Sequence, residues 1–254
     1  MKHGRLHMTN ANWTLDAAEL ARELAANSVE LINDFAAQAW ALPALPADCL
    51  RAIGGGAAEP GAPQAVIGAG TGFGMAVRAG SGERELVIVT EGGHASLAAG
   101  SETEDAVLRG LRSKYAHVSV ERVLSGPGLA ELYRQLARLG GAPDEGLTTP
   151  DIVARGLDGS CAISRSALDM FCGWLGSVAG NIALTTGALG GVYLAGGVVT
   201  HFLDFLAASA FRARFEAKGR MAGYLSAVPT FCVTHPDPAF LGLARYAAGG
   251  VRVG

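Results

Sequence analysis

The sequence predicts an α/β fold in which strands and helices alternate along the chain. Short apolar runs enter glycine-rich turns at 65–74 and 192–197, whereas longer segments with capping residues predict helices at 101–115 and 161–186. Glycine is frequent, with 36 residues in 254, and glycine permits tight turns and close backbone approaches. Hydrophobic residues make up 50% and charged residues 17%, so the chain can bury a core and is not intrinsically disordered.

Each element is predicted from a local pattern. The apolar runs that predict strands are, in chain order, 4–10, 28–32, 65–67, 75–78, 86–89 and 192–195. The segments whose caps or breakers predict helices begin at 13–16, 36, 101, 127, 149, 161 and 237. Asp16 with Glu19, and Ser101 with Glu104, have the spacing of a capping box. The runs 75–78 and 86–89 are expected to form a hairpin around Gly80-Ser81-Gly82.

Charge and cysteine usage exclude several classes. The net charge of −3 lacks the basic excess of a nucleic-acid binder, so no nucleic-acid partner is expected. The four cysteines form no C-x-x-C pair, which disfavours a zinc site and a disulfide framework. This cysteine usage fits a protein of the reducing cytoplasm. Residues 170–203 carry no charge and are long enough to span a bilayer, but glycine pairs and polar residues interrupt them. A buried core helix and a strand are therefore favoured over a membrane segment.

Two glycine turns are candidates for holding phosphate or a flat ligand. Gly68–Gly74 follows a predicted strand, where backbone N–H groups can point at an anion. It fits neither the dinucleotide fingerprint nor the Walker A pattern, so a plain hairpin turn is about as plausible as a phosphate cradle. Gly196-Gly197 also follows a predicted strand, and a tight strand–helix turn is the favoured interpretation of that pair alone.

Polar side chains at two further turns are candidates for binding hydroxyl groups. Asn33-Asp34 ends a predicted strand, where ligands of α/β folds commonly bind, although a cap or turn is slightly favoured. Glu91-Gly92-Gly93-His94 places a carboxylate and an imidazole three residues apart, and a solvated turn is equally plausible. The spacing is not that of a metal site, so no metal-ligating residues are predicted, and a polyhydroxylated ligand suits these groups better.

Taken together, seven segments in order resemble the bacterial glucokinases of the hexokinase–actin-like superfamily, over nearly the whole chain. They are Met8–Asn10 with Trp13, Ile32–Phe35, Gly68–Gly74, Glu91–His94, Glu121–Leu129, Leu194–Val199 and Phe215–Arg220. Each segment is a weak signal, whereas all seven in order are specific. Related sugar kinases with a cysteine-rich zinc motif after Gly-His are disfavoured, because no cysteine lies between Cys49 and Cys161.

The resemblance implies a two-lobe kinase fold of the actin-like ATPase (ribonuclease H-like) type and phosphorylation of glucose at its 6-hydroxyl by ATP, the first step of glycolysis. By resemblance, Asp34 is the general base. The residues that would hold the sugar hydroxyls are Asn33, Glu91, His94 and Glu121. The phosphate-facing turn would contain Gly70, Thr71, Gly72 and Gly74, and the adenosine-side turn Gly196 and Gly197. Mg²⁺ would be held mainly through the ATP phosphates. A homodimer is also implied.

The sequence departs from the family pattern at its start. Family members begin with a hairpin carrying Asp-x-Gly-Gly-Thr, which contacts the ATP phosphates, and this motif is absent here. An N-terminally truncated member is therefore expected, with most of the first lobe missing. Residues 1–44 would be the remnant of the small lobe, with the C-terminal helix 235–254 packed on it, and 45–234 the large α/β lobe. Unpaired strand edges in such a chain predict weak stability or association.

Two functions of different class remain open at this point. In the first, the chain is an active glucokinase, as the retained Asp34 and sugar residues favour. In the alternative, it is a catalytically silent sugar-binding or regulatory relative, as the absent phosphate hairpin favours.

Overall fold

The computed structural model describes residues 5–8 and 13–249, which divide into two compact units, Met1–Asp34 and Phe35–Gly254. In the first unit, strands β1 (Arg5–Met8) and β2 (Trp13–Asp16) form an antiparallel pair, and helix α1 (Ala17–Glu23) follows directly. The carboxylate of Asp16 caps this helix, because it accepts hydrogen bonds from the backbone of Ala18 and Glu19 at 2.9 and 3.2 Å.

Two predictions for this unit are wrong. Trp13–Leu15 lies in β2 rather than opening the helix, so only the Asp16 cap is confirmed. Residues 28–32 form no strand, although their run of Val, Leu and Ile predicted a buried one. An extended segment becomes a strand through hydrogen bonds to a neighbouring strand, and none of the described strands pairs with 28–32.

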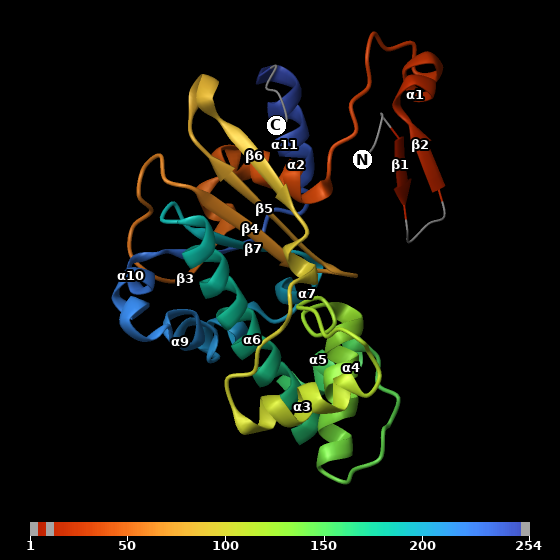
Figure 1. Ribbon diagram of the computed structural model, residues 1–254, viewed down its shortest axis with the longest axis vertical. Coiled ribbons are helices and arrows are strands. Elements are labelled where there is room, and N and C mark those ends of the chain that lie inside the picture. Colours follow the sequence, from red (N-terminus) through yellow and green to blue (C-terminus); the bar gives the residue numbers. More distant parts are fainter. Residues whose placement is uncertain (1–4, 9–12, 250–254) are drawn as a thin grey trace. The chain divides into compact units, whose positions relative to one another are not determined.

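The second unit is built around a mixed six-stranded sheet in the order β3-β8-β7-β4-β5-β6 (Figure 1). The strands are β3 (Leu50–Gly54), β4 (Gln64–Ala69), β5 (Phe73–Ala79), β6 (Leu86–Thr90), β7 (Val192–Ala195) and β8 (Thr230–Val233). β4, β7 and β8 run parallel, whereas β5, β6 and β3 are added antiparallel at the two sides. The expected hairpin β5–β6 is confirmed.

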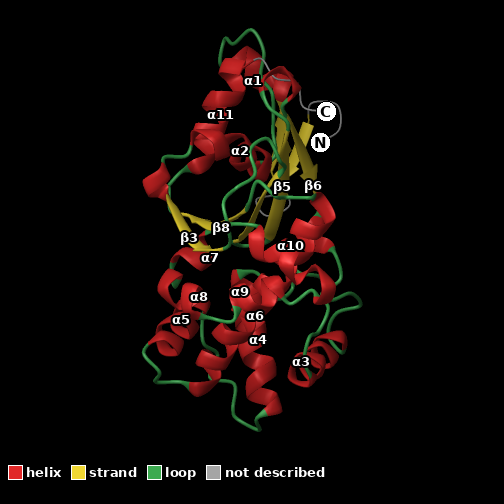
Figure 2. Cartoon of the chain, turned by 90° about the vertical axis from the view of Figure 1, so that its left-hand side faces the viewer, coloured by secondary structure: helices red, strands yellow, loops and turns green. Residues whose placement is uncertain are grey.

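Helices account for most of the remaining chain. They are α2 (Asp34–Ala41), α3 (Glu102–Arg112), α4 (Gly126–Leu139), α5 (Thr149–Leu157), α6 (Ala162–Thr186), α7 (Gly197–Thr200), α8 (Leu203–Ala208), α9 (Phe211–Glu216), α10 (Ala222–Ala227) and α11 (Pro238–Gly249). Figure 2 shows that α3, α4 and α5 gather at one end, away from the strands of the sheet, and the long helix α6 extends from these helices to β4. The predicted helices at 36–41, 101–115, 127–139, 149 onward, 161–186 and 237–248 are confirmed within a few residues.

The two faces of the sheet are covered by different helices. Ala65, Ile67 and Ala69 of β4 belong to the large apolar core that contains α4, α5, α6 and α9. On the opposite face, the directly paired Gly68 and Gly74 leave room for the ring of Phe35 at the start of α2. A side chain on either glycine would collide with that ring, so both positions require glycine.

Helix α6 is the central element of the large core. Its Gly176 and Gly180 lie against the backbone carbonyl groups of Phe211 and Phe215, which brings α9 into close contact. By length and composition alone α6 could cross a membrane, but 67% of its most apolar window is buried inside the fold. Burial of that window agrees with the core helix favoured from the sequence.

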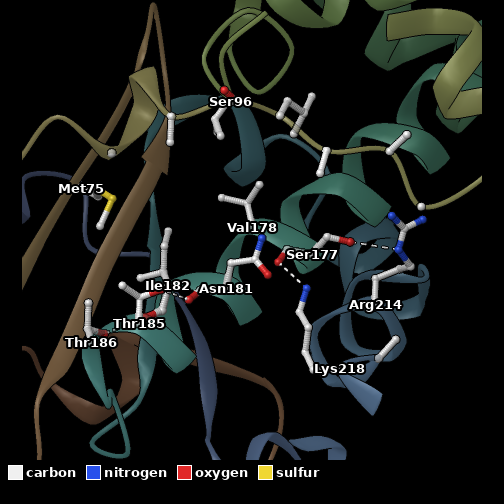
Figure 3. A pocket seen from close by; sticks show the side chains of 18 residues that line it. Met75, Ser96, Ser177, Val178, Asn181, Ile182, Thr185, Thr186, Arg214 and Lys218 are labelled. Atoms are coloured by element: carbon white, nitrogen blue, oxygen red, sulfur yellow. Dashed lines mark hydrogen bonds between the residues drawn. The ribbon is translucent and has the colours of Figure 1, made fainter. Parts of the chain in front are cut away.

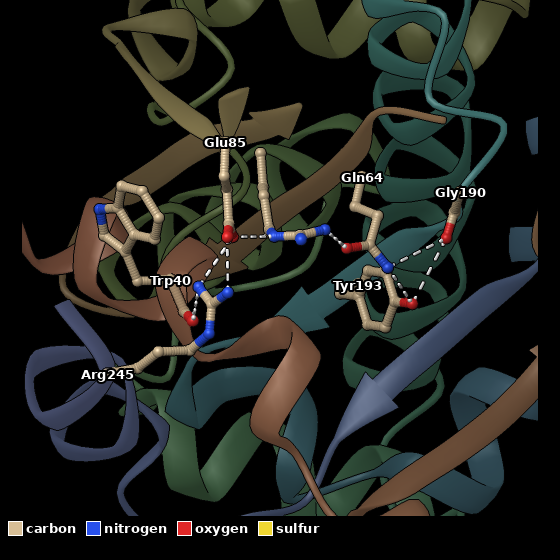
Figure 4. Close-up of polar contacts among 7 residues, drawn as sticks. Trp40, Gln64, Glu85, Gly190, Tyr193 and Arg245 are labelled. Atoms are coloured by element: carbon tan, nitrogen blue, oxygen red, sulfur yellow. Dashed lines mark hydrogen bonds and ion pairs between the residues drawn. The ribbon is translucent and has the colours of Figure 1, made fainter. Parts of the chain in front are cut away.

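A buried ion-pair network joins the C-terminal helix to the sheet (Figure 4). Glu85, just before β6, accepts hydrogen bonds from Arg245 of α11 at 2.7 and 2.5 Å and from Arg78 of β5 at 2.5 Å. Arg78 also donates to Gln64, which in turn donates to the Tyr193 hydroxyl. Burial acts to raise the pKa of Glu85, but the hydrogen bonds from Arg245 and Arg78 outweigh it, and the pKa lies below its usual value.

Candidate active site

The turn between β4 and β5 is fixed to the start of helix α4. Within the turn, the backbone N–H of Gly70 donates to the carbonyl of Gly72 at 2.8 Å. The carbonyl of Gly70 accepts from the backbone N–H of Gly126 at 2.8 Å, and the Thr149 hydroxyl donates to the Gly126 carbonyl at 2.6 Å. The turn thus lies beside the positive end of a 14-residue helix, where negative charge is stabilised.

The Gly196-Gly197 turn lies at the same edge of the sheet as the β4–β5 turn. β4 and β7 are parallel neighbours, with Gly68 paired to Ala195, so their carboxyl ends meet. Gly196 has φ +90°, and a Cβ there would lie 2.5 Å from the carbonyl oxygen of Ala69. This residue must therefore be glycine on two grounds. Gly197 begins α7 and faces open space.

Glu121 connects the β4–β5 turn to the loop that carries His94. Its side-chain Oε2 accepts from the backbone N–H of Phe73 at 2.9 Å, and its own backbone N–H donates to the carbonyl of Gly93 at 2.9 Å. Gly72 has no room for a side chain, because a Cβ would collide with Oε2 of Glu121. The position of the Glu121 carboxylate is thus fixed by the turn beside it.

Glu91 immediately precedes the short 3-10 turn Gly92–His94, and His94 is the last residue of that turn. Their side chains approach to 3.9 Å between Oε2 and Nε2, and they are 83% and 62% exposed. The backbone N–H of His94 donates to the carbonyl of Glu91 at 2.9 Å, and His117 Nε2 lies 2.9 Å from the His94 carbonyl oxygen. The backbone is held in place while both functional groups remain open to a ligand.

The structure therefore joins Glu91, His94, Glu121 and both glycine turns through contacts within the second unit. Asn33 and Asp34 belong to the first unit, and Asp34 is also the first residue of α2. Their place in the site stays a prediction. Within residues 5–8 and 13–249, no three His, Cys, Asp or Glu side chains are grouped so that they could hold a metal ion.

Sequence reasoning missed two residues that hold the β4–β5 turn. These are Gly126 and Thr149, which link the turn to the start of α4. The helix start at Pro127 was predicted. The local pattern, however, contains no sign that Gly126 contacts Gly70, which lies 56 residues earlier in the chain. The contact follows from tertiary packing of α4 and α5 beneath the turn.

This arrangement suits a hydroxylated ligand that meets a phosphate donor. Carboxylates accept hydrogen bonds from hydroxyl groups, and an imidazole can donate or accept them. Glycine turns with a helix start beside them expose backbone N–H groups and tolerate close approach by phosphate oxygens.

Comparison with known proteins agrees with this chemistry. The family model described as Glucokinase matches residues 1–249. The chain is 45% identical over 242 residues to a glucokinase of Paramagnetospirillum magneticum, covering 94% of this chain and 75% of that protein. A glucokinase of Yersinia pestis is 45% identical over 239 residues, covering 94% and 74%. The expected loss of an N-terminal segment is not borne out by these matches.

Solved structures agree in fold. A glucokinase from an Antarctic psychrotroph has a TM-score of 0.88 at 38% identity, covering 96% of this chain and 76% of that one. A ROK family glucokinase from Streptomyces griseus, in complex with glucose and AMPPNP, has a TM-score of 0.64 at 17% identity, covering 96% and 76%. The latter likeness concerns the fold alone, and it agrees with the expected actin-like kinase fold. The matches give no support to a catalytically silent relative.

Proposed function

The chain belongs to the glucokinase family, and on that premise we propose which of its residues carry out the reaction. Its function is transfer of the γ-phosphoryl group of ATP to the 6-hydroxyl of glucose. The observation that carries the assignment is the double link of Glu121, whose side chain binds the backbone of Phe73 while its backbone binds Gly93. That link brings a carboxylate, the glycine turn and the His94 loop together.

The sugar would be held by Glu91, His94 and Glu121, together with Asn33. The exposed Glu91 and His94 side chains present an acceptor and an adaptable donor or acceptor, as a ring of hydroxyl groups requires. Because the backbone of this loop is already bonded to Glu121, little ordering remains to be done when glucose binds.

Asp34 would accept the proton of the 6-hydroxyl. The oxygen then forms its new bond to the γ-phosphorus while the bond from that phosphorus to the bridging oxygen of ADP breaks. The proton moves to the Asp34 carboxylate, so charge and atoms balance. Phosphoryl transfer depends mainly on positioning and charge stabilisation, which one base and a rigid sugar site can provide.

The donor would lie along the two glycine turns, with its phosphates at Gly70–Gly74 and its adenosine at Gly196-Gly197. A Cβ at Gly70 or Gly197 would meet no atom within 4 Å, so the backbone is open at these two positions, and the helix start at Gly126 favours negative charge. Mg²⁺ would be bound through the phosphates and would neutralise their charge.

The direct test is formation of glucose 6-phosphate from glucose and Mg·ATP by the purified 254-residue chain. We expect product from the wild type, loss of turnover in Asp34→Asn, and unchanged turnover in the matched control Asp48→Asn. Absence of product from a folded wild-type chain, or equal rates in Asp34→Asn, would overturn the assignment.

We further propose that the protein works in the cytoplasm as a homodimer. The four cysteines are all free, as a reducing compartment requires. Light scattering at the enzyme's working concentration tests the dimer, and a monomeric mass for the active species would contradict it.

A further inference from the structure

A pocket of about 590 Å³ lies within the second unit between α6, α9 and the segment 95–100 that follows the His94 turn (Figure 3). Its walls come from Met75 of β5, from residues 177–186 of α6, from Arg214 of α9, and from Lys218 just beyond the end of α9. The sugar and phosphate residues assigned above do not line it. The pocket is large enough for a small organic molecule.

The pocket contains two cations and no carboxylate. None of its lining residues is Asp or Glu, and the α6 wall belongs to the stretch 170–203 that carries no charge at all. Arg214 is neutralised by the buried Glu104, to which it donates at 2.6 and 3.1 Å. Lys218 has no such partner among the described residues: its ammonium donates to the backbone carbonyl of Ser177 at 3.0 Å.

The Lys218 ammonium is held at the pocket by the packing of α9 on α6. Gly180 leaves room for the aliphatic part of the Lys218 side chain, because a Cβ at position 180 would lie 3.0 Å from Lys218 Cε. Burial lowers the pKa of Lys218, and the charge of Arg214 lowers it further. A half-buried cation without a carboxylate partner is a position where a bound anion gains from charge complementarity.

The rest of the wall matches a ligand with an apolar body. Apolar side chains from three segments line the cavity: Met75 of β5, Val178 and Ile182 of α6, and Leu97, Ala98 and Ala99. Ser177, Asn181 and Thr185, spaced four residues apart on α6, add polar groups along one edge. An apolar cavity with a few convergent polar groups is the usual form of a small-molecule site.

We propose that this pocket is a binding site for a small organic anion, a carboxylate or phosphate monoester with an apolar body, whose charge pairs with Lys218. The segment Phe215–Arg220 supplies this lysine and has no role in the sugar or phosphate site. Gly92 and Ala95 line the pocket on both sides of Gly93-His94, so an occupant contacts the same loop that presents His94.

The test compares a charged probe with a neutral one of the same shape on the full chain. Benzoate and phenyl phosphate are the anionic probes, which distinguish carboxylate from phosphate, and benzamide is the neutral match. Binding is followed by ligand-observed NMR. We expect one of the anions to bind at least about tenfold more tightly than benzamide, the equivalent of about 1.4 kcal/mol.

Variants locate the site. Lys218→Met keeps the stem and removes the charge, and we expect it to lose at least about tenfold in affinity for the anion. Lys218→Arg should retain binding. Arg220→Met, an exposed cation of the same segment outside the pocket, should bind as the wild type does.

Equal binding of anion and benzamide, binding of neither, or unchanged anion affinity in folded Lys218→Met would each overturn the proposal. Thermal melting establishes whether the variants fold. The comparison of charged and neutral probes on the wild type does not depend on any variant.

Discussion

The ion pairs of Glu85 provide the clearest stability prediction. The side chain of Glu85 is 3% exposed and pairs with Arg78 and Arg245, whose side chains are 13% and 31% exposed. Glu85→Gln retains the shape and one acceptor but removes the charge that both guanidinium groups face. The variant therefore leaves two half-buried cations without a counter-ion, at the place where α11 is joined to the sheet.

The expected loss follows from that burial. Removing one partner of a buried ion pair costs roughly 3–5 kcal/mol, and the residual exposure of both arginines reduces this to about 2–3 kcal/mol. For a domain of this size the melting temperature should fall by roughly 5–10 °C. The control Glu83→Gln alters an exposed glutamate two residues earlier and should change the free energy of unfolding by less than about 0.5 kcal/mol.

The assay is urea denaturation of the wild type and both variants over a range of pH. Because the pKa of Glu85 is lowered in the folded state, its contribution is complete above the usual value of 4.5. It is lost as the pH falls through the lower folded-state pKa. The difference between wild type and Glu85→Gln should therefore be constant near neutral pH and shrink below pH 4.5. A variant as stable as the wild type at neutral pH would refute this account of the network.

Three further predictions concern single side chains. His94→Ala should weaken glucose binding by roughly 1–3 kcal/mol in calorimetry, and an unchanged affinity would remove His94 from the site. Gly72→Ala should lower glucose affinity about tenfold, because the new methyl group would displace the Glu121 carboxylate. The control Gly223→Ala, at a position that faces open space, should leave glucose affinity unchanged. Equal affinities in the two variants would show that the turn does not determine the position of the Glu121 carboxylate. The Tyr133 hydroxyl is buried with no partner in the described part of the chain, so Tyr133→Phe should raise the free energy of unfolding by about 1 kcal/mol. A loss of stability in urea would instead reveal a partner.

Local patterns predicted the elements whose causes are local. Ser101 caps the start of α3 and Gly140 the end of α4 as predicted, and the β5–β6 hairpin follows from alternating runs around glycines. β3 and β8 were missed, because both are short and depend on pairing with distant segments: β3 pairs with β8, about 180 residues away, and β8 also pairs with β7. The apolar run at 28–32 was predicted as a strand, and it lacks a pairing strand in the described chain.

In the candidate site, too, features with local causes were predicted and features that depend on distant contacts were not. The individual residues Glu91, His94, Glu121 and the glycines were predicted from motifs and resemblance. Their connection was not, because the bond from Phe73 to Glu121 joins residues 48 positions apart and depends on how the turn packs on the loop. The pocket at Lys218 could not be predicted from the sequence either, because Lys218 contacts Ser177 only when α9 packs on the glycines of α6.

The most direct test of the central claim is the glucose affinity of Asp34→Asn, measured by calorimetry beside its rate of turnover. If Asp34 is the base and Glu91, His94 and Glu121 hold the sugar, affinity stays within about threefold of wild type while turnover falls roughly 10²–10⁴-fold. Loss of glucose binding together with turnover would contradict the account and make Asp34 a structural residue.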